Sequence, residues 1–454
     1  MSYTHSVAAD CASYFKQTIA RLKRDDLIIA VALLVFFVVS IVSLMVAGAT
    51  FRNMQFWPSD NMSPDALVGV GAMMLFIPAF AVARFSFGYI VAFFLLSAVL
   101  GYVWLSFYSG FDYPHALARW SMFGALVGAA TPLLFVNFEI SRPAVTEDAS
   151  RRIALALAAI AVLVLAADAS YGLTFGSPLG ADRNSVTRPL VLNYLTGIVI
   201  SGILPYLFAW FASGRQPIAA FLVLVLTAAY YPIAVNKTVL LLPLWLPIVF
   251  LLYARLNPRL ATILSLLIPM VIGLTQYELV RLYSPNDPYY LFGVFNLRMI
   301  SVPALAIDHY ANFFHDHALT NFCQISLVRA LMGCRYGELG PVMAQVYRAG
   351  NFNASFLATE GIASVGLQWT PVAALICGTI LSIGSLASRH LSPPFIAASS
   401  AAAAEVLVNV PLSTAMVSNG LALLFLLWWL TPPTPLVREQ PQNGIVASLG
   451  LAGD

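Results

Sequence analysis

Apolar stretches of about 20 residues recur along nearly the whole chain, and they constrain its fold more than any other feature. A transmembrane helix needs roughly 20 consecutive, mostly apolar residues to cross the hydrocarbon core of a bilayer. Twelve stretches approach this length and apolarity: 27–49, 66–83, 86–105, 120–137, 152–171, 189–212, 217–234, 238–254, 260–277, 370–387, 394–411 and 413–431.

The composition points the same way. Hydrophobic residues make up 60% of the chain and charged residues 9%, and the mean hydropathy is +0.83. A soluble domain carries about 25% charged residues, so a soluble globular enzyme is excluded. We predict an all-α, polytopic transmembrane bundle in which residues 1–454 form one integral membrane domain. It should have about twelve spans, within a range of eleven to thirteen.

Basic residues predict which connections lie inside the cell. Residues 1–26 should form a cytoplasmic, amphipathic N-terminus, because Lys16, Arg21, Lys23 and Arg24 precede the first span. That span is longer than the apolar region of a secretory signal, so we interpret it as retained. With the N-terminus inside, the cytoplasmic loops and the tail 432–454 hold Arg84, Arg142, Arg151, Arg152, Arg215, Arg255, Arg259, Arg389 and Arg438. The net charge of +3 provides no dense basic face, so we expect no nucleic-acid partner.

The outer connections also carry many basic residues, which is unusual for that side. They are Arg52, Arg119, Arg183, Arg188, Lys237, Arg281, Arg298, Arg329, Arg335 and Arg348. Individually, each is explained equally well by loop solubility or a local ion pair. As a set they favour an anionic ligand on the outer face, because guanidinium groups bind phosphate with two parallel hydrogen bonds.

The one long connection, residues 278–369, should be a large structured outer loop. Its content of Tyr, Phe, His, Arg and Leu is not that of a disordered segment. Residues 300–314 and 324–333 are predicted to form short helices in the membrane interface. Cys323 and Cys334 both fall here, and an oxidising periplasm would permit a disulfide without the spacing proving one.

The chain contains no nucleotide-binding loop and no zinc-protease motif. Three of its six histidines, His309, His315 and His317, lie close to Asp308 and Asp316. Hydrogen bonding or acid–base chemistry is the favoured interpretation over metal binding, so we expect no metal and no cofactor.

Three polar constellations fall on the outer side. The first is Asn236-Lys237-Thr238, where the lysine either extends to the interface or holds a phosphate. The second runs from Arg298 into Asp308-His309-Tyr310, as a phosphosugar site or an aromatic interface belt. The third contains Asn353 and Glu360 between glycines. We interpret it either as the lining of a polar cavity or as a helix cap.

Two carboxylates, Asp168 and Glu405, lie in or near predicted spans. Ionisable groups are costly in hydrocarbon and mark functional sites by default. Either carboxylate could instead pair with an arginine and hold the bundle together.

Residues 298 to about 386 resemble the Wzy-type oligosaccharide repeat-unit polymerases, also called O-antigen polymerases. The resemblance rests on Arg298 before Pro303, aromatic residues in 308–314, the polar stretch 317–326, and the run from Asn351 to Gly366. Lys237-Thr238 is similar to the basic position of this family and of O-antigen ligases. Ligases carry a histidine where this chain has Phe352, and this departure favours a polymerase.

The resemblance implies inverting, metal-independent glycosyl transfer at the periplasmic face of the bacterial inner membrane. The substrates would be oligosaccharides linked to undecaprenyl pyrophosphate, and a chain-length regulator is a further implied partner. Lys237, Arg298, Arg188 and Arg281 would stabilise the pyrophosphate, Tyr310 and Asn353 would contact substrate, and His309 with Asp308, or Glu360, would serve as base.

Three alternative functions are consistent with the same sequence. An O-antigen ligase or another lipid-phosphate-dependent glycosyltransferase shares the outer arginines and differs only in its substrate. A transporter of the same lipid-linked oligosaccharide would carry internal repeats and discontinuous midplane helices, and no repeat is visible. A structural or assembly protein would use the long loop as a docking surface.

Overall fold

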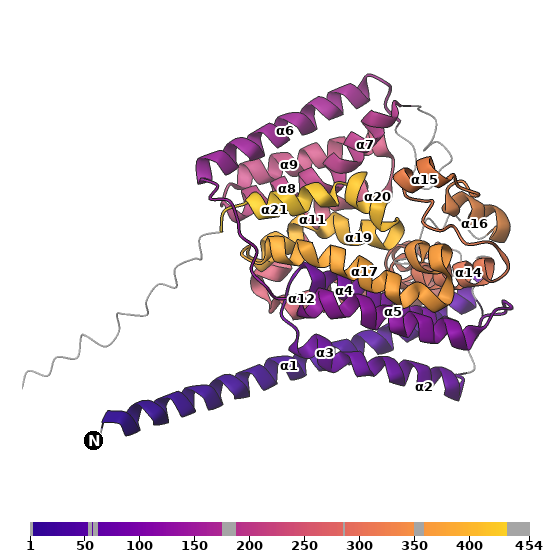
Figure 1. Ribbon diagram of the computed structural model, residues 1–454, viewed down its shortest axis with the longest axis horizontal. Coiled ribbons are helices and arrows are strands. Elements are labelled where there is room, and N and C mark those ends of the chain that lie inside the picture. The colour runs from indigo at the N-terminus through magenta and orange to yellow at the C-terminus, as the bar shows by residue number, and fades with distance from the viewer. Residues whose placement is uncertain are drawn as a thin grey trace, which may run out of the picture.

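The chain forms helices throughout the part that the computed structural model describes (Figure 1). The described residues are 3–52, 57, 62–174, 188–284, 287–348 and 358–433. Within these ranges no strand occurs. The prediction of an all-α protein is confirmed.

The helices of the first two thirds of the chain follow one another through short connections. In chain order they are α1 (Tyr3–Thr50), α2 (Pro64–Met73), η2 (Met74–Phe76), α3 (Ile77–Val82), α4 (Phe87–Leu105), α5 (His115–Phe135), α6 (Glu147–Ala169), α7 (Leu190–Ile198), η4 (Val199–Ile203), α8 (Leu204–Ser213), α9 (Pro217–Ala229), α10 (Tyr231–Ala234), α11 (Lys237–Arg255) and α12 (Pro258–Tyr283).

The helices of the last third are shorter and more often broken. They are α13 (Tyr290–Phe292), η5 (Gly293–Ser301), α14 (Val302–Asp316), α15 (Ser326–Met332), α16 (Leu339–Tyr347), η6 (Thr359–Ala363), α17 (Ser364–Ser388), α18 (Pro393–Ser399), α19 (Ala401–Asn409), α20 (Leu412–Val417) and α21 (Leu421–Leu430).

Eleven stretches of the described chain are helical, long enough and apolar enough to cross a membrane. The number lies within the predicted range, and the chain is a polytopic α-helical membrane protein. The stretches are Arg24–Thr50, Pro64–Val82, Phe87–Leu105, His115–Phe135, Glu147–Ala169, Leu190–Ser213, Pro217–Ala234, Thr238–Arg255, Pro258–Tyr283, Tyr290–Asp316 and Glu360–Ser388.

Helix ends gather at two opposite ends of the bundle. At the first, Arg259 at the start of α12 pairs with Asp26 of α1 at 3.1 Å and donates to the carbonyl of Ala81 in α3. We call this the basic end, because the arginines predicted to be cytoplasmic lie on its connections or in the adjoining turns of helices, except Arg438, which lies outside the described residues. At the opposite end, the Thr50 hydroxyl donates to Tyr277 at 3.3 Å.

The segment α13–η5–α14 does not cross from one end to the other, although its length and apolarity would allow it. Phe292 near its start stacks on Phe51, beyond the last residue of α1. Asp308 near its finish accepts a hydrogen bond from Ser109, which follows α4. Both contacts lie at the opposite end, so the segment begins and finishes at that end.

The predicted outer loop 278–369 therefore contains much more helix than a connection needs. It includes the last turn of α12, all of α13–η5–α14, α15, α16, η6 and the start of α17. The helix predicted at 300–314 corresponds to α14, and the one at 324–333 to α15. The apolar run 290–316 was missed as a long helix because Arg298 and Asp308-His309 interrupt it.

The last two predicted spans form a broken hairpin, α18 to α21. The helices break at Ser400, at Val410-Pro411 and before Gly420, whose φ of +73° places it in the left-handed region. The hairpin begins at the basic end and finishes there, where the ring of His390 contacts the carbonyl of Thr431 at 2.7 Å. We call residues 409–420 the hairpin tip.

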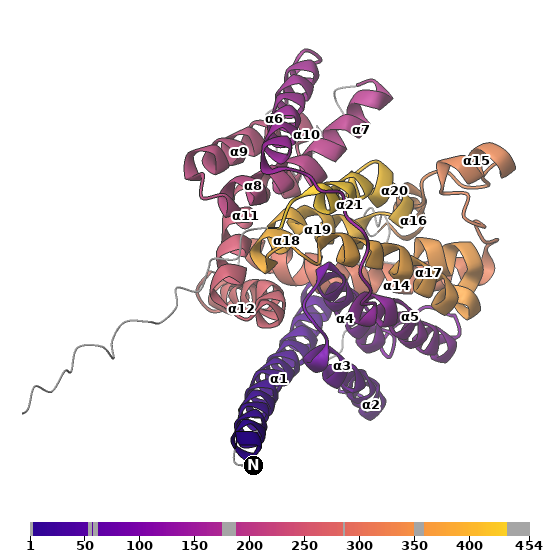
Figure 2. The ribbon, with the colours of Figure 1, turned by 60° about the vertical axis from the view of Figure 1, so that its left-hand side comes forward.

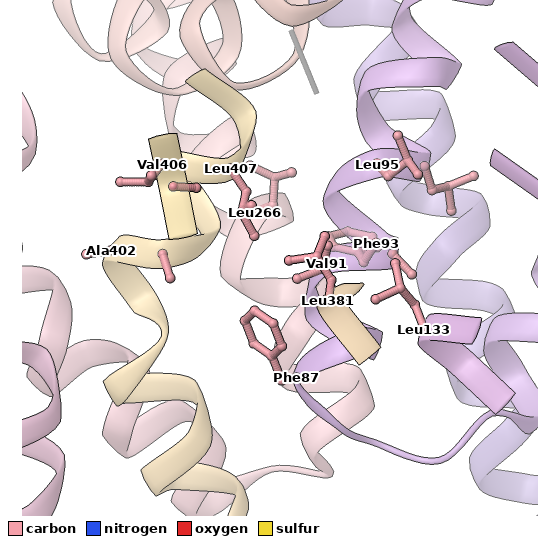
Figure 3. Close-up of a cluster of buried hydrophobic side chains, with 14 of the residues drawn as sticks. Phe87, Val91, Phe93, Leu95, Leu133, Leu266, Leu381, Ala402, Val406 and Leu407 are labelled. Carbon is pink, nitrogen blue, oxygen red and sulfur yellow. The ribbon is translucent and has the colours of Figure 1, made fainter. Parts of the chain in front are cut away.

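The core surrounds α4, since 94% of this helix is buried. Figure 3 shows Phe87, Val91 and Phe93 of α4 meeting Leu133 of α5 and Leu381 of α17, with Leu266 of α12 and the hairpin residues Ala402, Val406 and Leu407 nearby. Small residues let the helices approach closely. A Cβ atom on Gly378 of α17 would lie 2.5 Å from the carbonyl oxygen of Ala129 in α5.

Candidate functional site

Three π-helical segments converge on the hairpin tip. They are η4, η5 and η6, each continuous with an α-helix. A Cβ on Gly202 of η4 would lie 3.3 Å from the carbonyl oxygen of Gly420, and η5 and η6 each donate or accept a hydrogen bond at the tip. Single π-turns inside α-helices are rare and are frequent at functional sites.

Arg298 of η5 begins a chain of hydrogen bonds that extends into the hairpin. Its guanidinium donates to the side-chain oxygen of Asn409 at 3.3 Å. The amide nitrogen of Asn409 donates in turn to the carboxylate of Glu405 at 3.1 Å. Asn409 therefore connects the carboxylate of Glu405 to the guanidinium of Arg298. It also orients this guanidinium, which belongs to an exposed residue.

Glu360 of η6 contacts the hairpin tip three residues after Asn409. One of its carboxylate oxygens accepts the backbone N–H of Leu412 at 2.5 Å. Asn409 and Leu412 are three residues apart, so Arg298 and Glu360 contact one short piece of chain from two different helices. The structure thus places both predicted site residues at the hairpin tip, each with its own partner there.

Asp308 lies in a separate, buried network. It is 1% exposed and accepts hydrogen bonds from Ser109 at 2.8 Å and from the hydroxyl of Tyr113. Burial, together with the neighbouring Tyr102 and Asp308, raises the pKa of Tyr113, so its phenol remains protonated and donates. This network holds α14 against the connection that follows α4.

His309 and Tyr310 are fully buried as well. The His309 ring contacts the carbonyl of Leu305 at 2.7 Å and lies edge-on to Tyr347, with 4.2 Å between ring centroids. The Tyr310 ring lies 6.0 Å from that of Phe314. Both side chains are therefore packed in the interior of the protein and do not form an aromatic belt at its surface.

Arg188 lies beside a buried carboxylate. Its guanidinium is 3.5 Å from Asp168, which is 0% exposed, and it also donates to the carbonyls of Ile233 and Gly172. The hydroxyl of Thr196 donates to Asp168 at 2.5 Å. The pair joins α6, α7 and α10. Asp168 thus pairs with an arginine and holds helices together, and Arg188 has the same structural role.

The remaining predicted phosphate ligands are less informative. Arg281 makes an exposed ion pair with Glu278 at 2.6 Å, one turn away on α12. Lys237 begins α11, where the Asn236 side chain caps the helix by accepting from Val239 at 2.8 Å. The lysine side chain and Asn353 lie outside the described part of the structure.

A cleft of about 530 Å³ opens at the same end, between α5, α14 and the start of α17. Phe314, His315 and Trp369 line it, together with Gly366, whose φ of +75° breaks α17. Ile362 reaches the cleft from η6, two residues after Glu360. The cleft was not predicted, because its walls come from segments about 200 residues apart in sequence.

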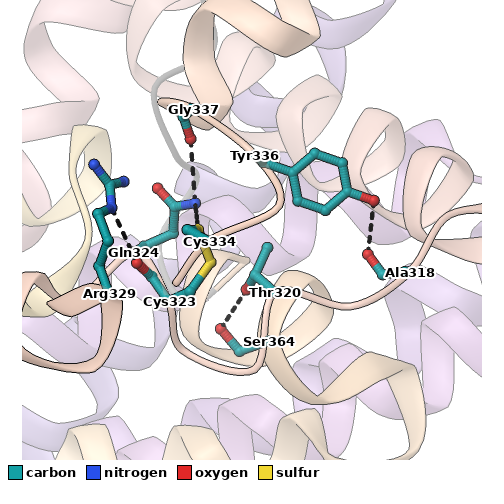
Figure 4. Close-up of a disulfide and its surroundings, with 9 residues drawn as sticks. All are labelled: Ala318, Thr320, Cys323, Gln324, Arg329, Cys334, Tyr336, Gly337 and Ser364. Carbon is teal, nitrogen blue, oxygen red and sulfur yellow. Dashed lines mark hydrogen bonds between the residues drawn. A yellow bond between two sulfur atoms is a disulfide. The ribbon is translucent and has the colours of Figure 1, made fainter. Parts of the chain in front are cut away.

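A disulfide joins Cys323 to Cys334 at this end (Figure 4). Below it, the Thr320 backbone donates to Ala363 at 2.7 Å, and the Thr320 and Ser364 hydroxyls are 3.0 Å apart. The stapled loop is thus tied to the start of α17. Disulfides persist in oxidising compartments and are rare in the cytosol.

Fold and site together define a polytopic α-helical membrane protein whose clustered polar groups, cleft and disulfide lie at the end opposite its arginine-rich connections. Comparisons of the chain with protein-family models, curated proteins and solved structures gave no significant match.

Proposed function

We propose that this protein is a glycosyltransferase that joins oligosaccharide repeat units carried on undecaprenyl pyrophosphate. The observation that carries the proposal is that Arg298 and Glu360 each bond to the hairpin tip, at Asn409 and at Leu412. A cation and a carboxylate bonded to one short turn supply the two charges that such a transfer needs. The resemblance of residues 298–386 to repeat-unit polymerases supports the same reaction.

The chemistry is a displacement at the anomeric carbon. The acceptor hydroxyl oxygen forms the new bond to this carbon, and the bond to the pyrophosphate oxygen breaks with its electron pair. Arg298, directed by Asn409, stabilises the charge that develops on the pyrophosphate. Glu360 takes the proton of the acceptor hydroxyl. Attack opposite the leaving group inverts the anomeric configuration.

The reaction takes place outside the cytoplasm in this proposal. Short basic connections favour the cytoplasmic side of a membrane, and the arginine-rich connections share the basic end. The Cys323–Cys334 disulfide supports an oxidising compartment for the opposite end. The protein then lies in the bacterial inner membrane with its hairpin tip toward the periplasm.

One observation favours a second function, transport of the same lipid-linked oligosaccharide. Transporter binding sites are built from discontinuous helices, and α18–α21 is a hairpin of short, broken helices. Transport would move the substrate across the membrane without changing its size. Polymerisation changes its size without requiring movement across the membrane.

The test uses purified protein in proteoliposomes with one lipid-linked repeat unit, and separates the products by size. A ladder of multiples supports polymerisation, and a single added block supports a single transfer. Unchanged substrate with folded protein contradicts glycosyl transfer altogether. A fluorescent lipid-linked substrate that changes leaflet without growing would favour the transporter.

A further inference from the structure

Helix α15 presents apolar side chains that nothing in the described chain covers. Leu327, Leu331 and Met332 are 71%, 78% and 75% exposed. In Figure 2, α15 stands out from the bundle with no helix on its outer side. Three large apolar side chains on one short helix are more than scattered surface residues.

The helix is held in place from behind. Cys323 and Cys334 flank it and join in the disulfide, and Cys323 is itself buried. The backbone of Thr320, three residues earlier, is bonded to Ala363. This attachment fixes α15 beside the start of α17, at the level where a spanning helix leaves the membrane. Figure 1 shows it at the same end of the molecule as α14 and α16.

The two charged side chains between Gln324 and Tyr336, on α15 and the residues that flank it, are positive. Arg329 and Arg335 are both exposed, and no acidic residue occurs from Gln324 to Tyr336. The Nε of Arg329 also donates to the carbonyl of Cys323 at 3.4 Å. Apolar side chains flanked by arginines are typical of elements that lie in the interface of an anionic lipid surface.

We propose that α15 is a disulfide-stapled anchor that inserts Leu327, Leu331 and Met332 into the outer leaflet while Arg329 and Arg335 contact lipid phosphates. The partner of this helix is the lipid bilayer and not another protein. The anchor fixes the height of the loop 317–339 above the cleft, and it operates whatever reaction the protein catalyses. Each arginine near an anionic surface adds roughly fivefold to membrane partitioning.

The test places a nitroxide at position 331 through Leu331→Cys, in a Cys11→Ser/Cys377→Ala background that keeps the disulfide. Mass spectrometry first verifies that Cys323 and Cys334 remain joined. The protein is reconstituted in nanodiscs of anionic or neutral lipid. Collisions with oxygen report lipid contact, and collisions with a water-soluble nickel complex report contact with water. The matched control is Glu338→Cys, an exposed position after the disulfide.

The proposal predicts that the label at 331 is accessible to oxygen and protected from nickel, while the label at 338 is accessible to nickel. Protection at 331 should be stronger in anionic nanodiscs, and Arg329→Glu/Arg335→Glu should remove that difference. Equal nickel access at both positions would overturn the proposal. So would spin–spin broadening at 331, which identifies a second copy, or protection from both reagents, which identifies a protein partner.

Discussion

The carboxylate of Glu360 accepts the backbone N–H of Leu412 at 2.5 Å, and this contact joins a π-helical turn to the tip of a broken hairpin. Pro411 precedes Leu412 and has no N–H of its own, so Leu412 provides the first amide after the break. Arg298 reaches the same tip through Asn409. The hairpin thus determines the spacing of two charged groups that belong to different helices.

The first prediction concerns the path of α13–η5–α14. Because Phe292 and Asp308 both contact the end opposite Arg24, Tyr289→Cys and Asp316→Cys should react with a membrane-impermeant maleimide from the same side. Arg215→Cys, on a connection at the basic end, should react only from the other side. Labelling of positions 289 and 316 from opposite sides would show that the segment crosses the membrane.

A second prediction tests the close contact of α5 with α17. Gly378→Ala should lower the free energy of unfolding by about 1–3 kcal/mol, because the new methyl group would lie 2.5 Å from the Ala129 carbonyl. Gly71→Ala is the matched control, since a Cβ there meets nothing within 4 Å. Thermal unfolding in one detergent measures both variants. Equal melting temperatures would contradict the packing.

A third prediction concerns the buried pair of Asp168 and Arg188. Asp168→Asn leaves the guanidinium without its countercharge and should cost about 3–5 kcal/mol. Arg188→Gln should cost a similar amount, because it leaves Asp168 charged and buried. The double variant should be more stable than the sum of the two losses allows. Additive losses in a double-mutant cycle would show that the two side chains do not interact.

The arrangement of spans could be predicted from sequence because it depends on local properties. Runs such as 27–49 are apolar over the length of a membrane, and short connections such as the one at Arg84 carry their own charge. Helix type and the helical bundle follow from these features alone. The break at Ser400 was missed because Ala-rich sequence continues across it, and the break at Gly420 because apolar residues flank Ser418-Asn419-Gly420 on both sides.

The candidate site was predictable only in part. Arg298 and Glu360 were identified individually, but their bonds to the hairpin tip require Asn409 and Leu412, which carry no chemical signal in sequence. Asp308 was selected as a candidate base without knowledge of its partners Ser109 and Tyr113, because these lie almost 200 residues earlier in the chain. Contacts of such separation come from packing and cannot be inferred from one sequence without homologues.

A fourth prediction separates the two charged groups at the tip by their chemistry. Glu360→Gln keeps an oxygen that can accept from Leu412 N–H, so the hairpin should remain folded. The amide is not a general base, and loss of such a base lowers rates by about 10²–10⁴-fold. Thermal unfolding and product formation should therefore diverge. Full activity in this variant would remove Glu360 from the proposed reaction.

The most direct measurement compares Arg298→Ala with Arg281→Ala in the lipid-linked repeat-unit assay. Both variants remove one exposed guanidinium from the same end of the bundle, but only Arg298 contacts the hairpin tip. We predict that Arg298→Ala lowers formation of the product ladder by about 10²-fold or more, while Arg281→Ala retains it. Equal ladders from two folded variants would contradict the account.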